Sequence, residues 1–305
     1  MSPAFARSYS HPDDLPAMID FLKSVRPAEW MHEYPAIFDL HEALGRLSIQ
    51  EKTRLWFADH DRLTAFAFML EPHNQLVFEI EPSHEGEIEN DLIRWGMDDC
   101  PGNNRGDSLI TSCREDDHRR VALLERQGFA RLAGCSLQMA RPLDKPIPPA
   151  QLPKGFSIRP VKGEQEVDEI VALHRAAFSA SSMTRDERLA IMRAPEYDPT
   201  LDLIVIAPEG QFAAYCTCSI SSAENRLTGR KVGHTDPVAS HPEYQRRGLA
   251  RALLLTGAHL LRERGMDLAV LGTEADNLAM QAAARSAGFA VYSKRIWFAK
   301  PIFHA

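Results

Sequence analysis

Residues 241–255 have the sequence HPEYQRRGLARALLL, which predicts a strand end, a tight turn with a glycine, and the start of an amphipathic helix. Gln245, Gly248 and Ala250 fit the pattern Gln/Arg-x-x-Gly-x-Gly/Ala. Glycine allows the backbone to approach a ligand closely, and the N–H groups at a helix start form a positively polarised cradle. Three arginines add full charges around it: Arg246, Arg247 and Arg251. We therefore expect a phosphate-bearing anion at this turn.

The segments around this turn support its interpretation as a strand–turn–helix unit. Residues 231–240 are apolar and extended in character, and Leu249, Ala252, Leu253, Leu260 and Leu261 mark one helix face. Gly265 is placed to end that helix. A strand at 267–272, Asn277, an alanine-rich helix, Gly288-Phe289 and a last strand are expected to follow.

This order of elements resembles the GCN5-related N-acetyltransferase (GNAT) superfamily, in which the Gln/Arg-x-x-Gly-x-Gly/Ala turn holds the acyl-CoA pyrophosphate. The resemblance implies an α/β (α+β) fold with a mixed, mostly antiparallel sheet flanked by helices. It also implies acetyl-CoA as cofactor, with contacts from the loop residues Gln245, Arg246, Arg247, Gly248, Leu249, Ala250 and Arg251.

Length and composition are those of an ordinary globular protein. The chain has 305 residues, which suggests two domains, and a net charge of −7, which argues against nucleic acid as a partner. No apolar run approaches the roughly 20 residues that cross a membrane, so we expect a cytoplasmic protein. The five cysteines form no CxxC pair, and we expect reduced thiols and no metal site.

An internal duplication predicts two tandem domains. Pro242, Asn277, Gly288 and Phe289 each lie 160 residues after a matching Pro82, Asp117, Gly128 and Phe129, and Asp276 matches Asp116 at the same offset. Residues 141–155 contain five prolines and are expected to be a semi-rigid linker. We therefore expect a GNAT-like domain at 1–140, the linker at 141–155, and a second GNAT domain at 156–305.

The two copies differ at the turn itself. At an offset of 160 residues, QRRGLA becomes EGEIEN, so that Ile88 replaces the glycine and three glutamates replace neutral or basic residues. These glutamates would repel a pyrophosphate. We therefore expect one acyl-CoA per chain, in the second domain.

The strand before the turn is expected to carry the reaction centre. In the GNAT pattern a bulge there exposes backbone groups to the pantetheine arm, and Val238, Ala239 and Ser240 occupy that place, with an ordinary edge strand as the alternative. His234 stands where histone-acetyltransferase-like members carry a glutamate base. Asp236 lies on the same strand face, so it could accept the proton itself or orient His234.

The general acid is less evident. Many GNATs have a tyrosine seven residues after the asparagine, but that position is Ala284 here. Tyr292 is a possible substitute, and direct departure of the CoA thiolate is the alternative. Asn277 would either contact the pantetheine or cap its helix.

The resemblance favours an enzyme that transfers an acetyl group from acetyl-CoA to a primary amine of a small-molecule or peptide acceptor by direct attack. Tandem two-domain GNATs have a similar layout. The alternative is a non-catalytic acyl-CoA-binding sensor or scaffold, which the missing tyrosine and glutamate would favour. The acceptor, the acyl chain length and the oligomeric state are not determined by the sequence.

Overall fold

The computed structural model describes residues 5–58, 62–71, 73–100, 108–178 and 183–302. By residue contacts the chain divides into two compact units. Unit 1 comprises residues 1–135, 226–228 and 295–305, and unit 2 comprises residues 136–225 and 229–294. Among the described residues, no helix combines the length and the hydropathy that crossing a membrane requires.

Unit 1 contains a sheet with strands in the order β1-β2-β3-β4-β5-β12. Its first five strands are β1 (Phe5–Ser8), β2 (Thr53–Ala58), β3 (Arg62–Leu70), β4 (Gln75–Ile80) and β5 (Ser108–Arg114). Its helices are α1 (Asp14–Val25), α2 (Ile37–Leu44), α3 (Leu47–Glu51), α4 (Glu85–Asp98) and α5 (His118–Arg126), with 3-10 turns η1 (Ala28–Trp30) and η2 (Pro82–His84).

Unit 2 repeats this plan, with strand order β7-β8-β9-β10-β11-β6. Its strands are β7 (Ser157–Pro160), β8 (Asp202–Ile206), β9 (Phe212–Ser219), β10 (Val232–Ser240) and β11 (Leu268–Glu274). Its helices are α6 (Val167–Phe178), α7 (Arg185–Met192), α9 (Leu249–Glu263) and α10 (Leu278–Ser286), with 3-10 turns η3 (Glu164–Glu166), η4 (Pro199–Leu201) and η5 (Pro242–Tyr244). Helix α8 (Ser222–Thr228) and strands β6 (Ala130–Pro142) and β12 (Ala290–Pro301) contribute residues to both units.

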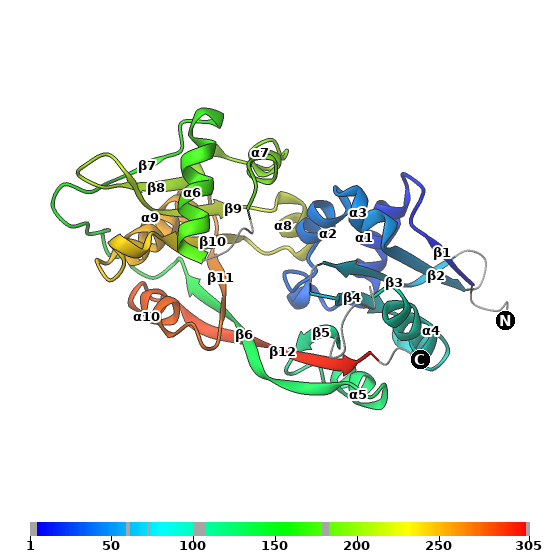
Figure 1. Ribbon diagram of the computed structural model, residues 1–305. Helices are drawn as coiled ribbons and strands as arrows, with labels where there is room; N and C mark the ends of the chain where they lie inside the picture. The colour runs from blue at the N-terminus through cyan, green and yellow to red at the C-terminus, as the bar shows by residue number, and fades with distance from the viewer. Residues whose placement is uncertain (1–4, 59–61, 72, 101–107, 179–182, 303–305) are drawn as a thin grey trace. The chain divides into compact units, whose positions relative to one another are not determined.

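The last strand of each sequence repeat completes the sheet of the other unit (Figure 1). In unit 1, residues 295–301 of β12 pair antiparallel with residues 108–114 of β5. In unit 2, residues 136–142 of β6 pair antiparallel with residues 268–274 of β11. Each sheet is thus mixed and mostly antiparallel, as predicted, because the β4–β5 and β10–β11 pairs are parallel and the other strand pairs of the described residues are antiparallel.

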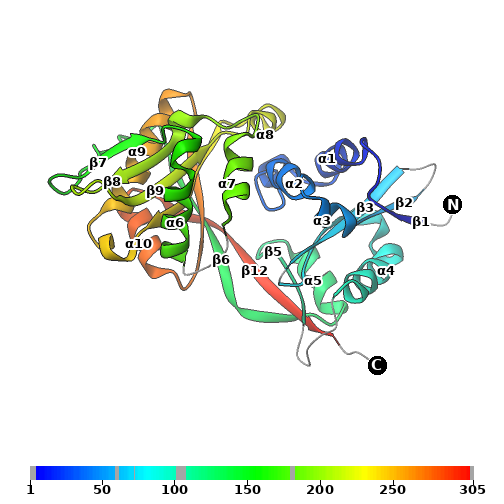
Figure 2. The same cartoon turned by 45° about the horizontal axis from the view of Figure 1, so that its top comes forward.

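Helices cover both faces of each sheet. Successive side chains of a strand point to opposite faces, and here both sets are apolar. In unit 2, Leu203 and Val205 of β8 pack in the core with α9, whereas Ile204 between them packs with Ile170 of α6. The two cartoon views agree that α6 and α9 lie on opposite faces of these strands (Figures 1 and 2). A strand that is apolar on both faces needs this double cover.

The duplication is visible in the elements themselves. The first and last residues of α10 lie 160 positions after those of α5. The same offset relates β11 to β5 and the turn η5 to η2. Asp117 and Asn277 both cap their helices, each accepting a 3.0 Å hydrogen bond from the backbone N–H three residues later. Gly128 and Gly288 end these helices with φ values of +79° and +87°.

The domain boundaries predicted at residues 140 and 156 stay a prediction. The division into compact units groups residues by their contacts and does not cut the chain into two consecutive segments. It falls between residues 135 and 136 and assigns residues 295–305 to unit 1. Leu143 and Ile147, within the proline-rich segment, are buried in the core of unit 2. The segment therefore packs against this unit along part of its length.

Replacing the two equivalent glycines with alanine should have unequal costs. At Gly128 a new Cβ meets nothing within 4 Å, so only the left-handed backbone is strained, by about 1–2 kcal/mol. At Gly288 the Cβ would clash with Nη1 of Arg141, a buried side chain that donates to the carbonyl oxygens of Ala287 and Pro146. Gly288→Ala should therefore lower the melting temperature measured by circular dichroism more than Gly128→Ala does. Equal losses would show that Arg141 moves aside without cost.

Candidate active site

The turn between η5 and α9 is anchored at both ends and open in the middle. Tyr244 before it and Leu249 after it are buried in the unit 2 core, whereas residues 245–248 are exposed. Arg246 and Gly248 have positive φ values of 58° and 80°. The chain therefore makes a sharp turn here and presents its backbone to solvent.

The backbone of this turn presents N–H groups without hydrogen-bond acceptors. In the part of the chain that the structure describes, no hydrogen bond satisfies the backbone N–H groups of residues 246–251. Gly248 is the N-cap residue of α9 and has no side chain to cap these donors, and a Cβ built there would meet nothing within 4 Å. Six unsatisfied donors at a helix start attract an anion.

The arginines around the turn add positive charge, and Arg247 lies close enough to the Glu209 carboxylate to help lower its pKa. Arg247 donates to the carbonyl oxygen of Glu243 at 3.0 Å, and its guanidinium lies 5.2 Å from the Tyr244 ring centroid. Arg251 donates to the carbonyl oxygen of Ser286 at 3.1 Å. Both side chains are thus held in place beside the turn.

Strand β10 separates from its parallel neighbour just before this turn. Val232, Gly233 and His234 pair with residues 268–270 of β11, and the pairing then ends. On the other side, pairing with β9 shifts register between Thr235 and Val238. The strand is therefore irregular where a bulge was expected, and it lies inside the sheet between β9 and β11 instead of at an edge.

Val238, Ala239 and Ser240 resume regular pairing with Cys216, Tyr215 and Ala214 of β9. No pairing to β11 is found for these three residues within the described chain. The backbone edge of residues 238–240 that faces β11 therefore borders the gap between the two parallel strands. This position suits an extended ligand arm that pairs with backbone groups.

Asp236 lies in this gap, and His234 lies beside it. The Asp236 carboxylate accepts a 3.0 Å hydrogen bond from the Gly272 N–H of β11, and its Oδ1 is 4.0 Å from His234 Nδ1. The two side chains are 36% and 28% exposed, so solvent or an acceptor molecule can reach them. Crowding by surrounding protein atoms raises the pKa of Asp236, although His234 and the Gly272 N–H oppose this shift.

The other predicted site residues are less closely tied to this gap. Asn277 uses its side-chain oxygen as the N-cap of α10, which is the structural role considered for it. Tyr292 lies in β12 with a residue exposure of 41%, and its role as a general acid stays a prediction. Ala284 is fully buried, so α10 places no proton donor at that position.

Unit 1 has no equivalent of the turn. Helix α4 begins directly after η2, at Glu85, so the residues that correspond to Gln245–Gly248 are already helical. Ile88, the counterpart of Gly248, is 1% exposed and packs in the core. The cradle of N–H groups is therefore found in unit 2 alone among the described residues.

Sequence reasoning missed Gly272. This glycine orients Asp236 through its backbone N–H, which any residue type could supply. The contact depends on how far β10 and β11 have separated at that point, and a single sequence carries no signal for that distance.

Comparison with known proteins assigns a family to unit 2. Residues 167–289 match the model of the acetyltransferase (GNAT) family. Three relatives share the name mycothiol acetyltransferase. The protein from Pseudarthrobacter chlorophenolicus is 27% identical over 235 residues, which are 74% of this chain and 71% of the relative. That from Saccharomonospora viridis is 27% identical over 60% of this chain and 62% of the relative, and that from Thermomonospora curvata is 30% identical over 60% and 61%. The match thus spans less than two thirds of the latter two relatives.

Two solved structures share the fold over the whole chain. A GCN5-related N-acetyltransferase from Sphaerobacter thermophilus has a TM-score of 0.73 at 20% identity, covering 100% of this chain and 98% of that one. A tandem GNAT protein from the clavulanic acid biosynthesis pathway has a TM-score of 0.74 at 13% identity, covering 99% of both chains. Residues 167–289 of unit 2 therefore match the GNAT family, and the chain as a whole has the fold of a tandem GNAT protein.

Proposed function

We propose that unit 2 transfers an acetyl group from acetyl-CoA to a primary amine of a small-molecule or peptide acceptor. The observation that carries this proposal is the turn at residues 245–248, with its unsatisfied N–H donors and its arginines. The mycothiol acetyltransferase name of the relatives agrees with an acetyl group as the group transferred.

The residues present fit acetyl-CoA. The backbone of residues 246–251 and the side chains of Arg246, Arg247 and Arg251 would hold the pyrophosphate, because they offer only donors and positive charge. The β11-facing backbone of residues 238–240 would hold the pantetheine arm. When bound, acetyl-CoA supplies an acetyl group that is activated as a thioester.

The chain's own residues would then manage the proton of the acceptor. An amine is protonated at neutral pH and must lose a proton before it attacks, after which the C–N bond forms and the C–S bond breaks. The carboxylate of Asp236 would accept that proton, since its raised pKa brings it nearer to neutral pH. His234, 4.0 Å away, would either share this role or orient Asp236.

A non-catalytic acyl-CoA-binding protein is the second candidate. It is favoured by one observation, the fully buried Ala284 at the position where many GNATs carry a tyrosine acid. In an enzyme without that tyrosine, the thiolate would leave unprotonated or would take its proton from Tyr292.

Binding of acetyl-CoA should depend on charge at the turn. Gly248→Asp and Gly248→Asn both place a side chain that tolerates positive φ in open space, and they differ only in charge. We expect isothermal titration to give about one equivalent of acetyl-CoA for the native chain. Gly248→Asn should keep its affinity within several-fold, whereas Gly248→Asp should weaken it by at least about tenfold, since like charges near 4 Å repel by about 4 kcal/mol at an effective dielectric constant of 20.

If both substitutions weakened acetyl-CoA binding equally, the cause would be the changed backbone at residue 248 and not the added negative charge. Two equivalents would mean that unit 1 also binds acetyl-CoA, in spite of its helical turn region.

Catalysis should depend on Asp236 and on pH. Asp236→Asn keeps an oxygen for the Gly272 N–H but cannot accept a proton, so kcat should fall by about 10²–10⁴ while the Kd for acetyl-CoA stays unchanged. In the native chain, kcat/KM should rise with pH through a pKa above that of an ordinary aspartate. This rise should be absent in Asp236→Asn and present, at reduced rate, in His234→Gln.

The stability of Asp236→Asn provides a control against loss of activity through unfolding. Because folding raises the pKa of Asp236, the stabilisation of its protonated form is complete at low pH and is lost as pH rises through the raised pKa. Asp236→Asn should therefore melt no lower than the native chain at pH 7, and unfolding cannot explain a loss of kcat. Stoichiometric acetyl-CoA binding without acetylation of any amine in a broad panel would favour the non-catalytic candidate.

A further inference from the structure

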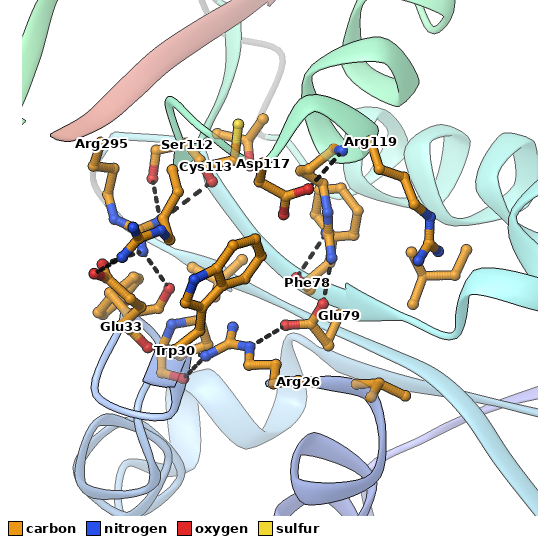
Figure 3. Close-up of a pocket in the computed structure, with 18 of the residues that line it drawn as sticks. Arg26, Trp30, Glu33, Phe78, Glu79, Ser112, Cys113, Asp117, Arg119 and Arg295 are labelled. Atoms are coloured by element: carbon orange, nitrogen blue, oxygen red, sulfur yellow. Dashed lines mark hydrogen bonds and ion pairs between the residues drawn. The ribbon is translucent and has the colours of Figure 1, made fainter. Parts of the chain in front are cut away.

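The parallel strands of unit 1 also separate, and a cavity of about 320 Å³ opens between them (Figure 3). β4 and β5 share only the pair Gln75 and Ile110. The cavity is lined by residues 75–80 of β4, residues 111–114 of β5, the start of α5, and residues between α1 and α2. Its charged lining comes from Arg26, Glu33, Glu79, Arg114, Asp117, Arg119, Arg120 and Arg295. All of these residues belong to unit 1.

Arg26, Arg114, Arg120 and Arg295 meet in this lining around two buried glutamates, in a chain whose net charge is −7. Each of two glutamates is shared between two arginines. Glu79 pairs with Arg26 at 2.6 Å and also with Arg120. Glu33 pairs with Arg114 and, at 3.6 Å, with Arg295. One carboxylate cannot neutralise two guanidiniums, so positive charge remains in a site with little access to water.

The carboxylate of Glu79 is ionised, and the paired arginines are mostly shielded from solvent. Burial alone raises the pKa of Glu79, but Arg26 and Arg120 more than offset this, so its pKa lies below the ordinary value. The side chains of Arg26, Arg114 and Arg120 are 11–12% exposed. Asp116 also pairs with Arg114, at 2.8 Å, but it is 60% exposed and its charge is screened by water.

Aromatic rings hold the guanidiniums in fixed orientations. Arg120 lies 4.3 Å from the Phe78 ring centroid, Arg114 lies 5.0 Å from that of Trp30, and Arg295 lies 5.8 Å from that of Tyr34. Within the described chain, Arg26 Nη2 and Arg120 Nε donate no hydrogen bond. The site is therefore preorganised and retains donors for a ligand.

The fold itself does not require these charges. At the 160-residue offset, the positions of Glu79, Arg114, Arg119 and Arg120 are Ala239, Glu274, Ala279 and Met280 in unit 2. The same framework thus folds without the arginines, which indicates that they serve a purpose particular to unit 1.

We propose that this cavity of unit 1 binds a small organic anion with two negative charges, a dicarboxylate or a phosphate monoester. Guanidinium forks match the oxygens of both groups, and the cavity volume lies at the lower end of the range for small-molecule sites. A whole acyl-CoA is not the ligand, because unit 1 lacks the turn that would hold a pyrophosphate.

The test is isothermal titration of succinate and of inorganic phosphate into the full-length Gly248→Asp protein, in which the turn of unit 2 no longer favours anions. Succinamide, which is neutral, is the control ligand. We expect one saturable site per chain for at least one dianion and none for succinamide. Saturation by succinate alone would assign dicarboxylates, and saturation by phosphate alone would assign phosphate monoesters.

Two further substitutions in this background should shift the affinity in opposite directions. Arg120→Gln removes a guanidinium and should weaken binding at least about tenfold. Glu79→Gln removes a competing carboxylate and should strengthen binding several-fold, which a damaged fold could not do. Arg46→Gln, an exposed position of unit 1 outside the lining, should change nothing. Absence of a saturable site, or loss of affinity in both Arg120→Gln and Glu79→Gln, would overturn the proposal.

Discussion

The separation of two parallel strands is the constraint on which both halves of this molecule depend. β11 is held over seven residues by β6 but meets β10 over only three, and β5 is held over seven residues by β12 but meets β4 at one pair. A strand with one fully paired edge stays ordered while its other edge is left open. The exchanged strands, β6 and β12, therefore make the two gaps possible, and each gap exposes backbone and side chains that a closed sheet would bury.

The two gaps have the same architecture, but their positive charge comes from different groups. In unit 2 the positive potential lies at the turn, where the N–H groups at the start of α9 are flanked by arginines, and the side chains in the gap are those of Asp236 and His234. In unit 1 the corresponding turn is helical, and the positive potential comes from arginine side chains within the gap itself. Backbone donors suit a long ligand that enters from the turn, whereas clustered guanidiniums suit a compact one.

Much of the fold was predictable because its signals are local. The helix after Gly248, the cap at Asn277 and the glycine end at Gly288 each follow from residue type and spacing, and the repeat at 160 residues carried the assignment over to unit 1. The strand exchange was not predictable, because residues 136–142 have the same alternating pattern whichever unit they pair with. Pairing partners that are distant in sequence leave no trace in local composition.

The candidate site was likewise predictable only where its signals are local in the sequence. The turn was found from its glycine and arginines, whereas the position of Asp236 against the Gly272 N–H depends on the register shift in β10. The arginines of unit 1 were not noticed, because Arg26, Arg120 and Arg295 lie far apart in the sequence and meet only through the fold. Their number also costs stability, since buried like charges repel and Arg295 has a pKa that burial lowers. A framework that folds in unit 2 without these charges keeps them in unit 1 at that cost, and the proposed binding of a small anion would offset it.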